Sequence, residues 1–186
     1  MVRLNKLYTR TGDDGSTGLG DGSRRNKADL RIAAMGEIDE ANATLGMARR
    51  EASAATDTVL RRVQNDLFDL GADLAVPASE DAGERLRIDP AQVVWLEAET
   101  DLATDQLEPL TSFILPGGSA AAATLHLART VVRRAERAMA ALNAKEPLNP
   151  AALAYINRLS DLLFALARLE NDGGRSDVLW VPGANR

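Results

Sequence analysis

The chain has 186 residues, a formal net charge of −5 and a pI near 5.0. This length suffices for one domain with a core of its own, and the acidic balance argues against a nucleic-acid partner or a membrane surface. The absence of cysteine and the single histidine exclude disulfides, thiolate sites, cysteine nucleophiles and multi-histidine metal sites. No apolar run approaches the roughly 20 residues that span a bilayer, and no secretory signal is visible, so we expect a cytoplasmic protein.

The stretch from Tyr8 to Asp21 is polar and rich in glycine. No apolar period runs through it, so it is predicted to be neither helix nor strand. Glycines let a backbone approach a ligand closely, and successive N–H groups can wrap a phosphate chain. The stretch is neither a Walker A loop nor a Rossmann fingerprint. Its composition fits a phosphate-binding loop and a flexible N-terminal tail equally well.

Five segments carry apolar residues at three- and four-residue steps, which predicts helices. The first begins between Asn26 and Asp29, and the others span about 57–74, 90–106, 119–143 and 150–170. With short connections and no strand pattern, they predict an all-α fold, a five-helix antiparallel bundle. Residues 77–87 are predicted to form an exposed loop without visible chemistry. The tail after the last helix is predicted to be irregular, and Trp180 to dock on the bundle.

The fourth predicted helix carries a stripe of charged side chains. At about 100° per residue, four of them share one quadrant: Arg129, Arg133, Glu136 and Arg137. His126 lies in the same quadrant, whereas Arg134 points elsewhere. The arginines repel one another, Glu136 offsets only part of that, and arginine forks suit phosphate oxygens. A phosphate clamp is therefore favoured over the alternative, a solvated charged face.

Four further residues stand out. Phe113 lies in a short apolar run before Pro-Gly-Gly and, from the residues alone, is predicted to plug the core. Asp39 directly follows Ile38 in an apolar series, so it faces a partner or sits in a solvated acidic turn. Asn157 reads a base or ribose with its amide, or is a surface asparagine. Ser119 is predicted to be a plain helix cap rather than an anion site.

Several motifs in this order resemble the PduO-type ATP:cob(I)alamin adenosyltransferases, over nearly the whole chain. Besides Lys27 they are T-R-T-G-D-D-G-S-T-G-L at 9–19, E-I-D-E-A-N-A at 37–43, F-I-L-P-G-G at 113–118, H-L-A-R-T-V-V-R-R-A-E-R at 126–137 and N-R-L-S-D-L-L-F at 157–164. The resemblance implies a five-helix bundle (ferritin-like, cobalamin adenosyltransferase-like) assembled as a homotrimer. A single domain, 1–186, would comprise an ATP-binding loop (1–27), the bundle (28–170) and a C-terminal tail (171–186).

The same resemblance implies an ATP site between neighbouring subunits. One subunit wraps the triphosphate with Thr9, Arg10, Thr11, Gly12, Thr17 and Lys27. The neighbouring subunit contributes Arg133, Arg134, Glu136, Arg137 and Asn157. Asp39 and Arg129 resemble an intersubunit ion pair, and Phe113 resembles the aromatic residue at the lower face of the corrin. Catalytic roles are thus implied for Arg133, Phe113, Asp39 and Arg129.

The implied reaction needs no side-chain nucleophile. Cobalt, as Co(I), attacks the 5′-carbon of ATP, and the protein supplies orientation and stabilisation of the leaving triphosphate, helped by Mg²⁺ held through the ATP phosphates. An external flavin reductase would supply the electron, and a B12-dependent enzyme would accept the adenosylcobalamin. Two alternatives belong to other classes: a non-catalytic carrier of ATP or adenosylcobalamin, and a structural adaptor bundle.

Overall fold

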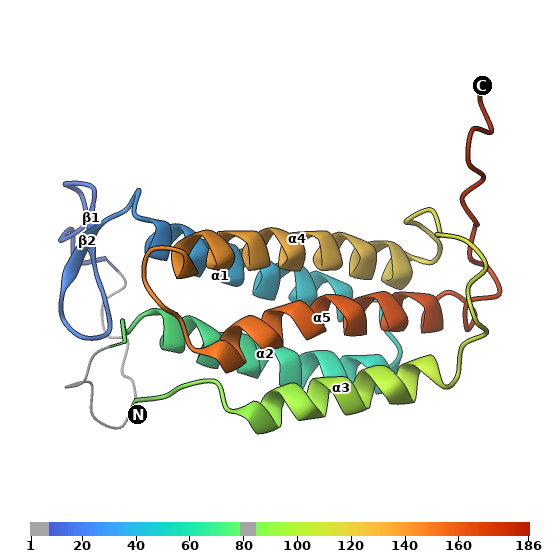
Figure 1. Ribbon diagram of the computed structural model, residues 1–186, viewed down its shortest axis with the longest axis horizontal. Coiled ribbons are helices and arrows are strands. Elements are labelled where there is room, and N and C mark those ends of the chain that lie inside the picture. The colour runs from blue at the N-terminus through green and yellow to red at the C-terminus, as the bar shows by residue number, and fades with distance from the viewer. Residues whose placement is uncertain (1–7, 79–84) are drawn as a thin grey trace.

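The computed structural model describes residues 8–78 and 85–186. They form five helices, α1 (Leu30–Ala48), α2 (Ala54–Leu74), α3 (Pro90–Thr104), α4 (Ala120–Asn143) and α5 (Pro150–Leu169), and two strands, β1 (Ser16–Gly18) and β2 (Arg24–Asn26). Successive helices run in opposite directions along the long axis (Figure 1). The predicted five-helix antiparallel bundle is confirmed. The first seven residues of the predicted N-terminal loop, and 79–84 of the predicted loop 77–87, lie outside the described residues.

Each helix begins at a side-chain cap, which accepts a hydrogen bond from a backbone N–H two or three residues further on. The caps are Asp29, Ser53, Asp89, Ser119 and Asn149. Because these oxygens satisfy N–H groups that have no partner inside the helix, they determine where each helix starts. Ser53 starts α2 three residues earlier than the apolar pattern predicted. Ser119 is the plain cap that was expected.

The core lies along the seams between neighbouring helices. Helix α4 packs against α1 and α5, α3 packs against α5, and α2 packs against α1. Leu45, Leu67, Leu125, Met139 and Tyr155 are among the side chains that are 0–1% exposed at these seams. Each large apolar side chain buried in this way contributes about 1.5–3 kcal/mol. None of the described helices combines the length and the apolarity that a bilayer crossing needs.

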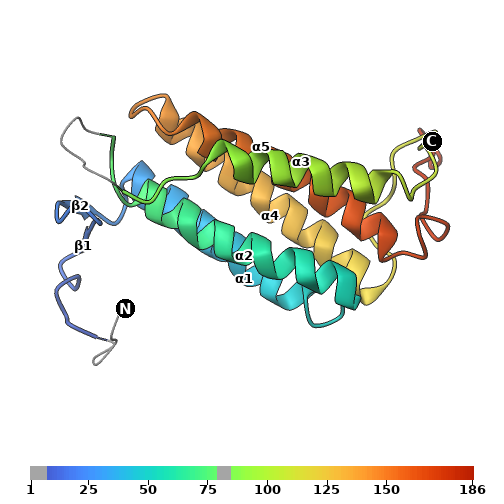
Figure 2. The ribbon, with the colours of Figure 1, turned by 90° about the horizontal axis from the view of Figure 1, so that it is seen from below.

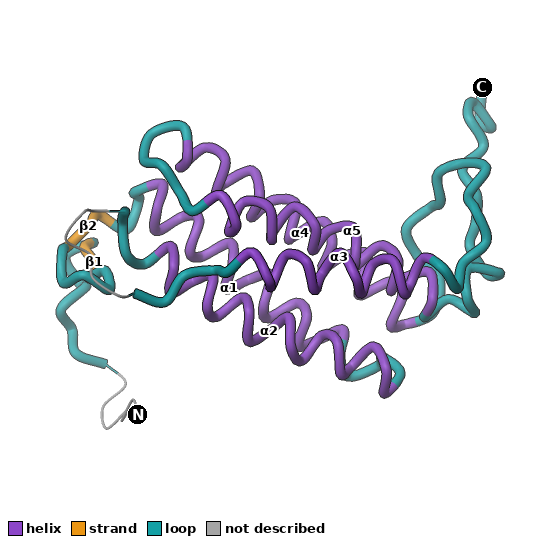
Figure 3. Tube along the Cα trace, turned by 60° about the horizontal axis from the view of Figure 1, so that its bottom comes forward, coloured by secondary structure: helices purple, strands orange, loops and turns teal. Residues whose placement is uncertain are grey.

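The non-helical segments gather at the two ends of the bundle (Figures 2 and 3). The β1–β2 hairpin lies at the end where α1 starts and α2 finishes. The loop between α3 and α4 and the C-terminal tail lie at the opposite end. The two loops that attracted attention in the sequence are therefore separated by the length of the bundle within one chain.

The N-terminal stretch contains a strand, so the prediction that it has none was wrong. Strands β1 and β2 pair antiparallel, with Thr17 opposite Arg25. Asp14 accepts hydrogen bonds from the N–H and the hydroxyl of Ser16, and Asp21 accepts the same pair from Ser23. These local turns specify the hairpin without any apolar alternation, which is why a search for period-two hydrophobicity missed it.

The hairpin is attached to the end of α2. Leu19 is 7% exposed, and the N–H of Gly20 donates to the carbonyl of Ala75 at 2.8 Å. A Cβ on Gly20 would come within 3.0 Å of Cγ2 of Val76, so glycine permits this close approach. The hairpin is thus attached to the bundle at Leu19 and Gly20, and the residues before it bond within the loop.

Candidate active site

Two basic side chains close the N-terminal loop on itself. Lys27 Nζ donates to the carbonyl of Gly12 at 2.7 Å, and Arg24 Nη2 donates to the carbonyl of Thr11 at 2.6 Å. The hydroxyls of Thr9 and Thr11 lie 2.8 Å apart and are exposed. The loop therefore presents hydroxyls, backbone groups and a lysine at one place, which suits a phosphate chain.

Backbone geometry in this loop is unusual at two positions. Arg10 has φ 63°, a left-handed conformation that is uncommon for a residue other than glycine. A Cβ on Gly12 would lie 2.9 Å from the carbonyl oxygen of Ser16 and 3.2 Å from Lys27 Nζ, so only glycine fits there. Conformations of this kind occur at ligand-binding loops more often than elsewhere.

A cleft of about 840 Å³ lies over α5, between α3 and α4. Its wall is completed by residues 107–114, which leave the end of α3. Arg129 and Arg133 from α4 line it, together with Phe164 and Arg168 from α5. The volume falls within the range of small-molecule sites, roughly 300–1,000 Å³, and the lining combines apolar surface with charged groups of both signs.

Arg129 has an unsatisfied hydrogen-bond donor at this cleft. Its Nε is buried without a hydrogen-bond partner among the described residues. Burial, and secondarily the nearby charge of Arg133, lower the pKa of Arg129. An arginine in this state favours an anion supplied from outside the subunit.

Glu136 and Asn157 meet where α4 packs against α5. The amide Nδ2 of Asn157 donates to Oε1 of Glu136 at 2.7 Å, and its Oδ1 accepts from Arg158. Arg137, one residue further along α4, is exposed, and among the described residues its side chain donates only to the backbone carbonyl of Arg133. Among the predicted ATP ligands of α4 and α5, the structure thus brings Glu136 and Asn157 into direct contact.

The sequence of the chain matches a known family. The sequence pattern for cobalamin adenosyltransferase matches residues 7–170. The chain belongs to the cobalamin adenosyltransferase family. It is 50% identical to the corrinoid adenosyltransferase of Mycobacterium tuberculosis, covering 100% of this chain and 97% of that protein. It is 51% identical to the cobalamin adenosyltransferase of Cupriavidus metallidurans, over 96% of this chain and 95% of that one.

A solved structure extends the match to three dimensions. It is a phenylalanine-to-alanine variant of the PduO-type ATP:corrinoid adenosyltransferase from Lactobacillus reuteri, complexed with cobalamin and ATP. The two chains share 38% identity with a TM-score of 0.88, over 94% of this chain and 99% of that one. The predicted membership of the PduO-type adenosyltransferases is confirmed.

Phe113 differs from the prediction that its residue type alone suggested. It does not plug the core, because its side chain is 78% exposed at the rim of the cleft. Its ring lies 6.2 Å from the ring of Trp180, centroid to centroid. The exposed ring is accessible at the cleft, and the contact with a corrin that the family resemblance implied stays a prediction.

Arg134 is held by its own subunit. Its Nε donates to Glu37 Oε2 at 2.5 Å, and its Nη2 contacts Glu40, so α4 and α1 are tied together. These hydrogen bonds raise the pKa of the guanidinium above its ordinary value. Arg134 does lie off the arginine stripe, which consists of Arg129, Arg133 and Arg137, as its helical position predicted. Its assignment to ATP stays a prediction.

Asp39 is exposed on α1, between Glu37 and Glu40, the two residues that Arg134 contacts. It borders a separate, largely apolar hollow between α1 and α2, whereas Arg129 borders the cleft. No ion pair joins Asp39 to Arg129 among residues 8–78 and 85–186. This placement agrees with a pair that forms only between two subunits, and that pairing also stays a prediction.

The loop and the arginine stripe do not meet in one subunit. In the described part of the chain, no hydrogen bond or ion pair joins Thr9, Arg10, Thr17 or Lys27 to the predicted ligands on α4 and α5. The hairpin lies at one end of the bundle. The loop between α3 and α4, residues 105–119, carries the rim of the cleft and lies at the other end (Figure 1); we call it the rim loop. In the described part of one subunit the two predicted sets of ATP ligands are therefore not joined, and a site shared between subunits stays a prediction.

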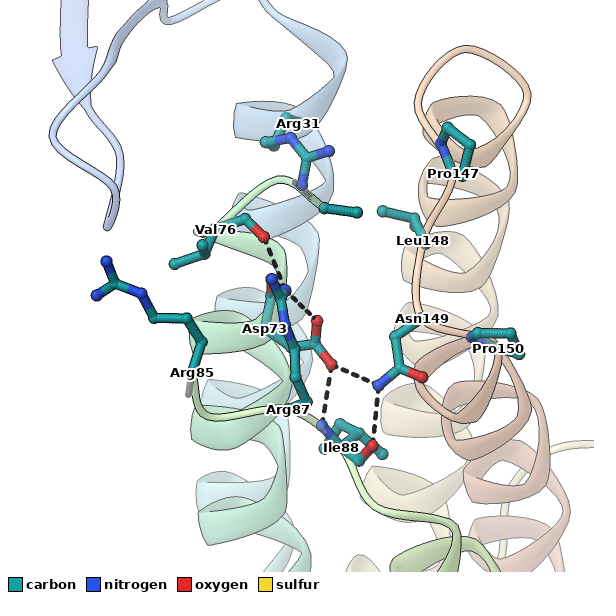
Figure 4. Close-up of a pocket in the computed structure, with 11 residues that line it drawn as sticks. Arg31, Asp73, Val76, Arg85, Arg87, Ile88, Pro147, Leu148, Asn149 and Pro150 are labelled. Atoms are coloured by element: carbon teal, nitrogen blue, oxygen red, sulfur yellow. Dashed lines mark hydrogen bonds and ion pairs between the residues drawn. The ribbon is translucent and has the colours of Figure 1, made fainter. Parts of the chain in front are cut away.

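A second pocket, of about 550 Å³, opens at the hairpin end of the bundle (Figure 4). It contains arginines, but its central charges neutralise one another. Asp73 accepts from Arg87 Nη1 at 2.7 Å, from the N–H of Ile88 at 2.9 Å and from Asn149 Nδ2 at 2.8 Å. Arg31 is paired with Glu146 at 2.9 Å. The cluster joins α2, the start of α3 and the start of α5, so it is a structural junction.

Two residues around the site were missed from the sequence. Arg24 was not singled out, because only the hairpin register brings it to the loop carbonyls. Arg168 was not singled out either, yet it is 7% exposed, and it pairs with Asp177 at 2.8 Å. A charged residue beside the apolar positions of a helix is a weak signal for burial, and its partner belongs to the tail.

Proposed function

We propose that this chain transfers the 5′-deoxyadenosyl group of ATP to cob(I)alamin, giving adenosylcobalamin and inorganic triphosphate. The observation that carries the proposal is the close structural match to an adenosyltransferase that holds cobalamin and ATP. The chain's own cleft supports it, because an apolar wall stands there beside Arg129, whose buried Nε has no hydrogen-bond partner among the described residues.

The step needs no catalytic base. The electron pair of Co(I) forms a bond to the 5′-carbon of ATP, the bond from that carbon to the triphosphate oxygen breaks, and the pair leaves with the triphosphate. Cobalt ends formally as Co(III). The protein must hold the 5′-carbon in line with cobalt and stabilise the charge on the leaving group.

The triphosphate is assigned to the N-terminal loop and the arginine stripe. Lys27 and the backbone around Gly12 would hold it from one subunit, and Arg133 and Arg137 from the neighbouring subunit. The exposed hydroxyls of Thr9 and Thr11 are hard oxygen groups that fit beside a magnesium-bound phosphate chain. Mg²⁺ carried by ATP would neutralise part of the charge on the leaving triphosphate.

The corrin is assigned to the cleft, with Phe113 against its lower face. Reduction of Co(II) is hard while a lower axial ligand stabilises it. An exposed aromatic ring at the rim would exclude that ligand and leave four-coordinate Co(II), which is easier to reduce. The electron would come from an external flavin reductase, and a B12-dependent enzyme would take the product.

The active assembly is inferred to be a homotrimer with its sites between subunits. Two observations support this inference. Arg129 has a buried Nε with no partner among the described residues, and Asp39 is an exposed carboxylate with no ion pair in the described part of its own subunit. A neighbouring copy would bring such groups together and would also bring the hairpin to the arginine stripe.

An anaerobic assay with cob(I)alamin, ATP and Mg²⁺ tests the proposal. We expect loss of the Co(I) absorption band, growth of a light-sensitive cobalt–carbon product, and triphosphate in equal amount. Arg133→Ala should raise the barrier by about 3–4 kcal/mol, the typical cost of one lost charge-stabilising donor. Arg50→Ala, an exposed arginine at the end of α1, is the matched control and should react normally. ATP binding without product would instead indicate a carrier, and absence of ATP binding would indicate an adaptor bundle.

A further inference from the structure

The stretch that carries Phe113 is held by the C-terminal tail. Ile114 forms an antiparallel bridge with Leu179, and the N–H of Trp180 donates to the carbonyl of Phe113 at 2.7 Å. The N–H of Leu115 donates to the carbonyl of Val178 at 2.8 Å. The position of Phe113 at the rim of the cleft therefore depends on where the tail lies.

Apolar burial holds the tail only in part. Val178, Leu179 and Trp180 remain 61%, 41% and 45% exposed, so none of them is locked in the core. Asp177, directly before them, is different. Its Oδ2 accepts from Arg168 Nε at 2.8 Å, and the two side chains are 4% and 8% exposed.

The anchor at Asp177 reaches both ends of the rim loop. Arg168 also donates from Nη2 to the carbonyl of Glu108 at 3.0 Å, where the loop leaves α3. The other oxygen of Asp177, Oδ1, accepts from Asn171 Nδ2 at 2.8 Å, and Asn171 Oδ1 accepts from the N–H of Ser119, where the loop enters α4. The end of α5 thus holds the start of the loop, its finish and the tail through one network.

Glycine at position 118 belongs to this network. Gly118 has φ 98°, and a Cβ there would collide with the side-chain amide of Asn171. Glycine at position 118 therefore serves packing as well as the turn, because the Asn171 amide that donates to Asp177 occupies that space.

We propose that Asp177 is a positioning residue for the adenosylation site, acting through the buried Arg168 pair and the tail to place Phe113 at the cleft. The inference rests on the proposed role of Phe113 in excluding the lower axial ligand of Co(II). Asp177 touches neither substrate. Its effect is confined to the lower face of the corrin, and ATP binding at the hairpin and the arginine stripe does not depend on it.

The test compares Asp177→Asn with Asp172→Asn. Both remove one aspartate charge from the segment after α5, but Asp172 belongs to an exposed pair with Arg175. Asn also tolerates the φ of 58° at position 172. Asp177→Asn should accelerate hydrogen exchange of the Leu115 and Trp180 amides by about tenfold or more, and Asp172→Asn should not. Unchanged exchange in Asp177→Asn would overturn the inference, whatever Phe113 does.

A second experiment tests function: the spectrum of bound cob(II)alamin, with ATP present, measures the fraction of four-coordinate Co(II). Asp177→Asn should reduce the four-coordinate fraction and slow adenosylation from Co(II) by about tenfold to a hundredfold, while the Kd for ATP and the rate from prereduced cob(I)alamin stay normal. A chain ending at Asp177 keeps the ion pair but lacks the paired tail, and it should show the same loss, so the test does not depend on one variant folding. If Phe113→Ala abolishes the four-coordinate species and both tail variants retain it, the inference fails and the proposed function stands. If Phe113→Ala also retains it, the proposed role of Phe113 is what fails.

Discussion

The amide of Asn157 on α5 donates to the carboxylate of Glu136 on α4 across 2.7 Å. The two residues are partly exposed and 21 positions apart in the chain. Both are predicted ATP ligands, and their contact means that one cannot be changed without releasing the other.

Asn157→Ala is therefore expected to weaken ATP binding by about 1.5–3 kcal/mol, the usual worth of a hydrogen bond to a charged group. Titration calorimetry with ATP measures this directly. Asn65→Ala removes an amide from an exposed position on α2, where Nδ2 bonds only to the carbonyl of Arg61, and should leave ATP binding unchanged. Equal affinity in both variants would remove Asn157 from the ATP site.

Phe113→Ala should leave ATP affinity near normal, because the ring lies at the rim of the cleft and away from the hairpin. Adenosylation that starts from Co(II) should slow by about tenfold or more, the scale on which a misplaced reactant slows an enzyme. Stopped assays with a reductant present compare this rate with that from prereduced cob(I)alamin. Unchanged Co(II)-dependent rates would contradict the proposed role.

Asp39→Ala and Arg129→Ala should each weaken the contact between subunits, since breaking a buried ion pair costs about 3–5 kcal/mol. Analytical ultracentrifugation and steady-state kinetics measure the two consequences. The exchange variant Asp39→Arg with Arg129→Asp should recover part of the loss, because the pair is restored in reverse. Normal trimer mass and normal kinetics in both single variants would dismiss the assignment.

His126 provides a pH-dependent prediction. It is the only histidine of the chain, is 4% exposed and packs edge-on against Phe164. Burial, and secondarily the charge of Arg129, lower the pKa of His126, and Asp177 opposes this only in part. The folded protein thus resists protonation that the unfolded chain accepts near pH 6.5. The free energy of unfolding should be unaffected by this group above about pH 6.5 and should fall as the pH drops below that value.

NMR titration of the single imidazole should give a midpoint below 6.5, and urea unfolding at several pH values should show the decline. His126→Phe removes the titrating group, so the part of the decline between about pH 6.5 and 5 should flatten even if the absolute stability changes. A wild-type midpoint at or above 6.5 would refute the prediction.

The helices were predictable because their determinants are local. Leu60, Leu67 and Leu74 recur at helical steps, and Asp89 and Asn149 precede prolines, so period and caps together define the segments. The arginine stripe was predictable for the same reason, since positions 129, 133 and 137 must align on one helix. The hairpin was not, because its specification lies in two Asp-Gly-Ser turns rather than in an apolar pattern.

The burial of Phe113 and Arg168 could not be predicted from the sequence. Residue type suggested a buried phenylalanine and gave no reason to expect a buried arginine, but the structure exposes Phe113 and buries Arg168. Burial depends on which segments pack over a position, and both residues owe theirs to the tail and the rim loop.

By itself, the sequence determined that this protein is a helical bundle with a phosphate-binding character, and its motifs indicated the adenosyltransferase family. Period, caps and motif order are properties of neighbouring residues, so the chain carries them before it folds. Only the tertiary structure decided that the hairpin and the cleft lie at opposite ends of one subunit. It also decided that Arg134 forms ion pairs with Glu37 and Glu40, and that Asp177 holds the tail through its pair with Arg168. These are contacts between segments far apart in sequence, and they exist only once helix packing has brought the segments together.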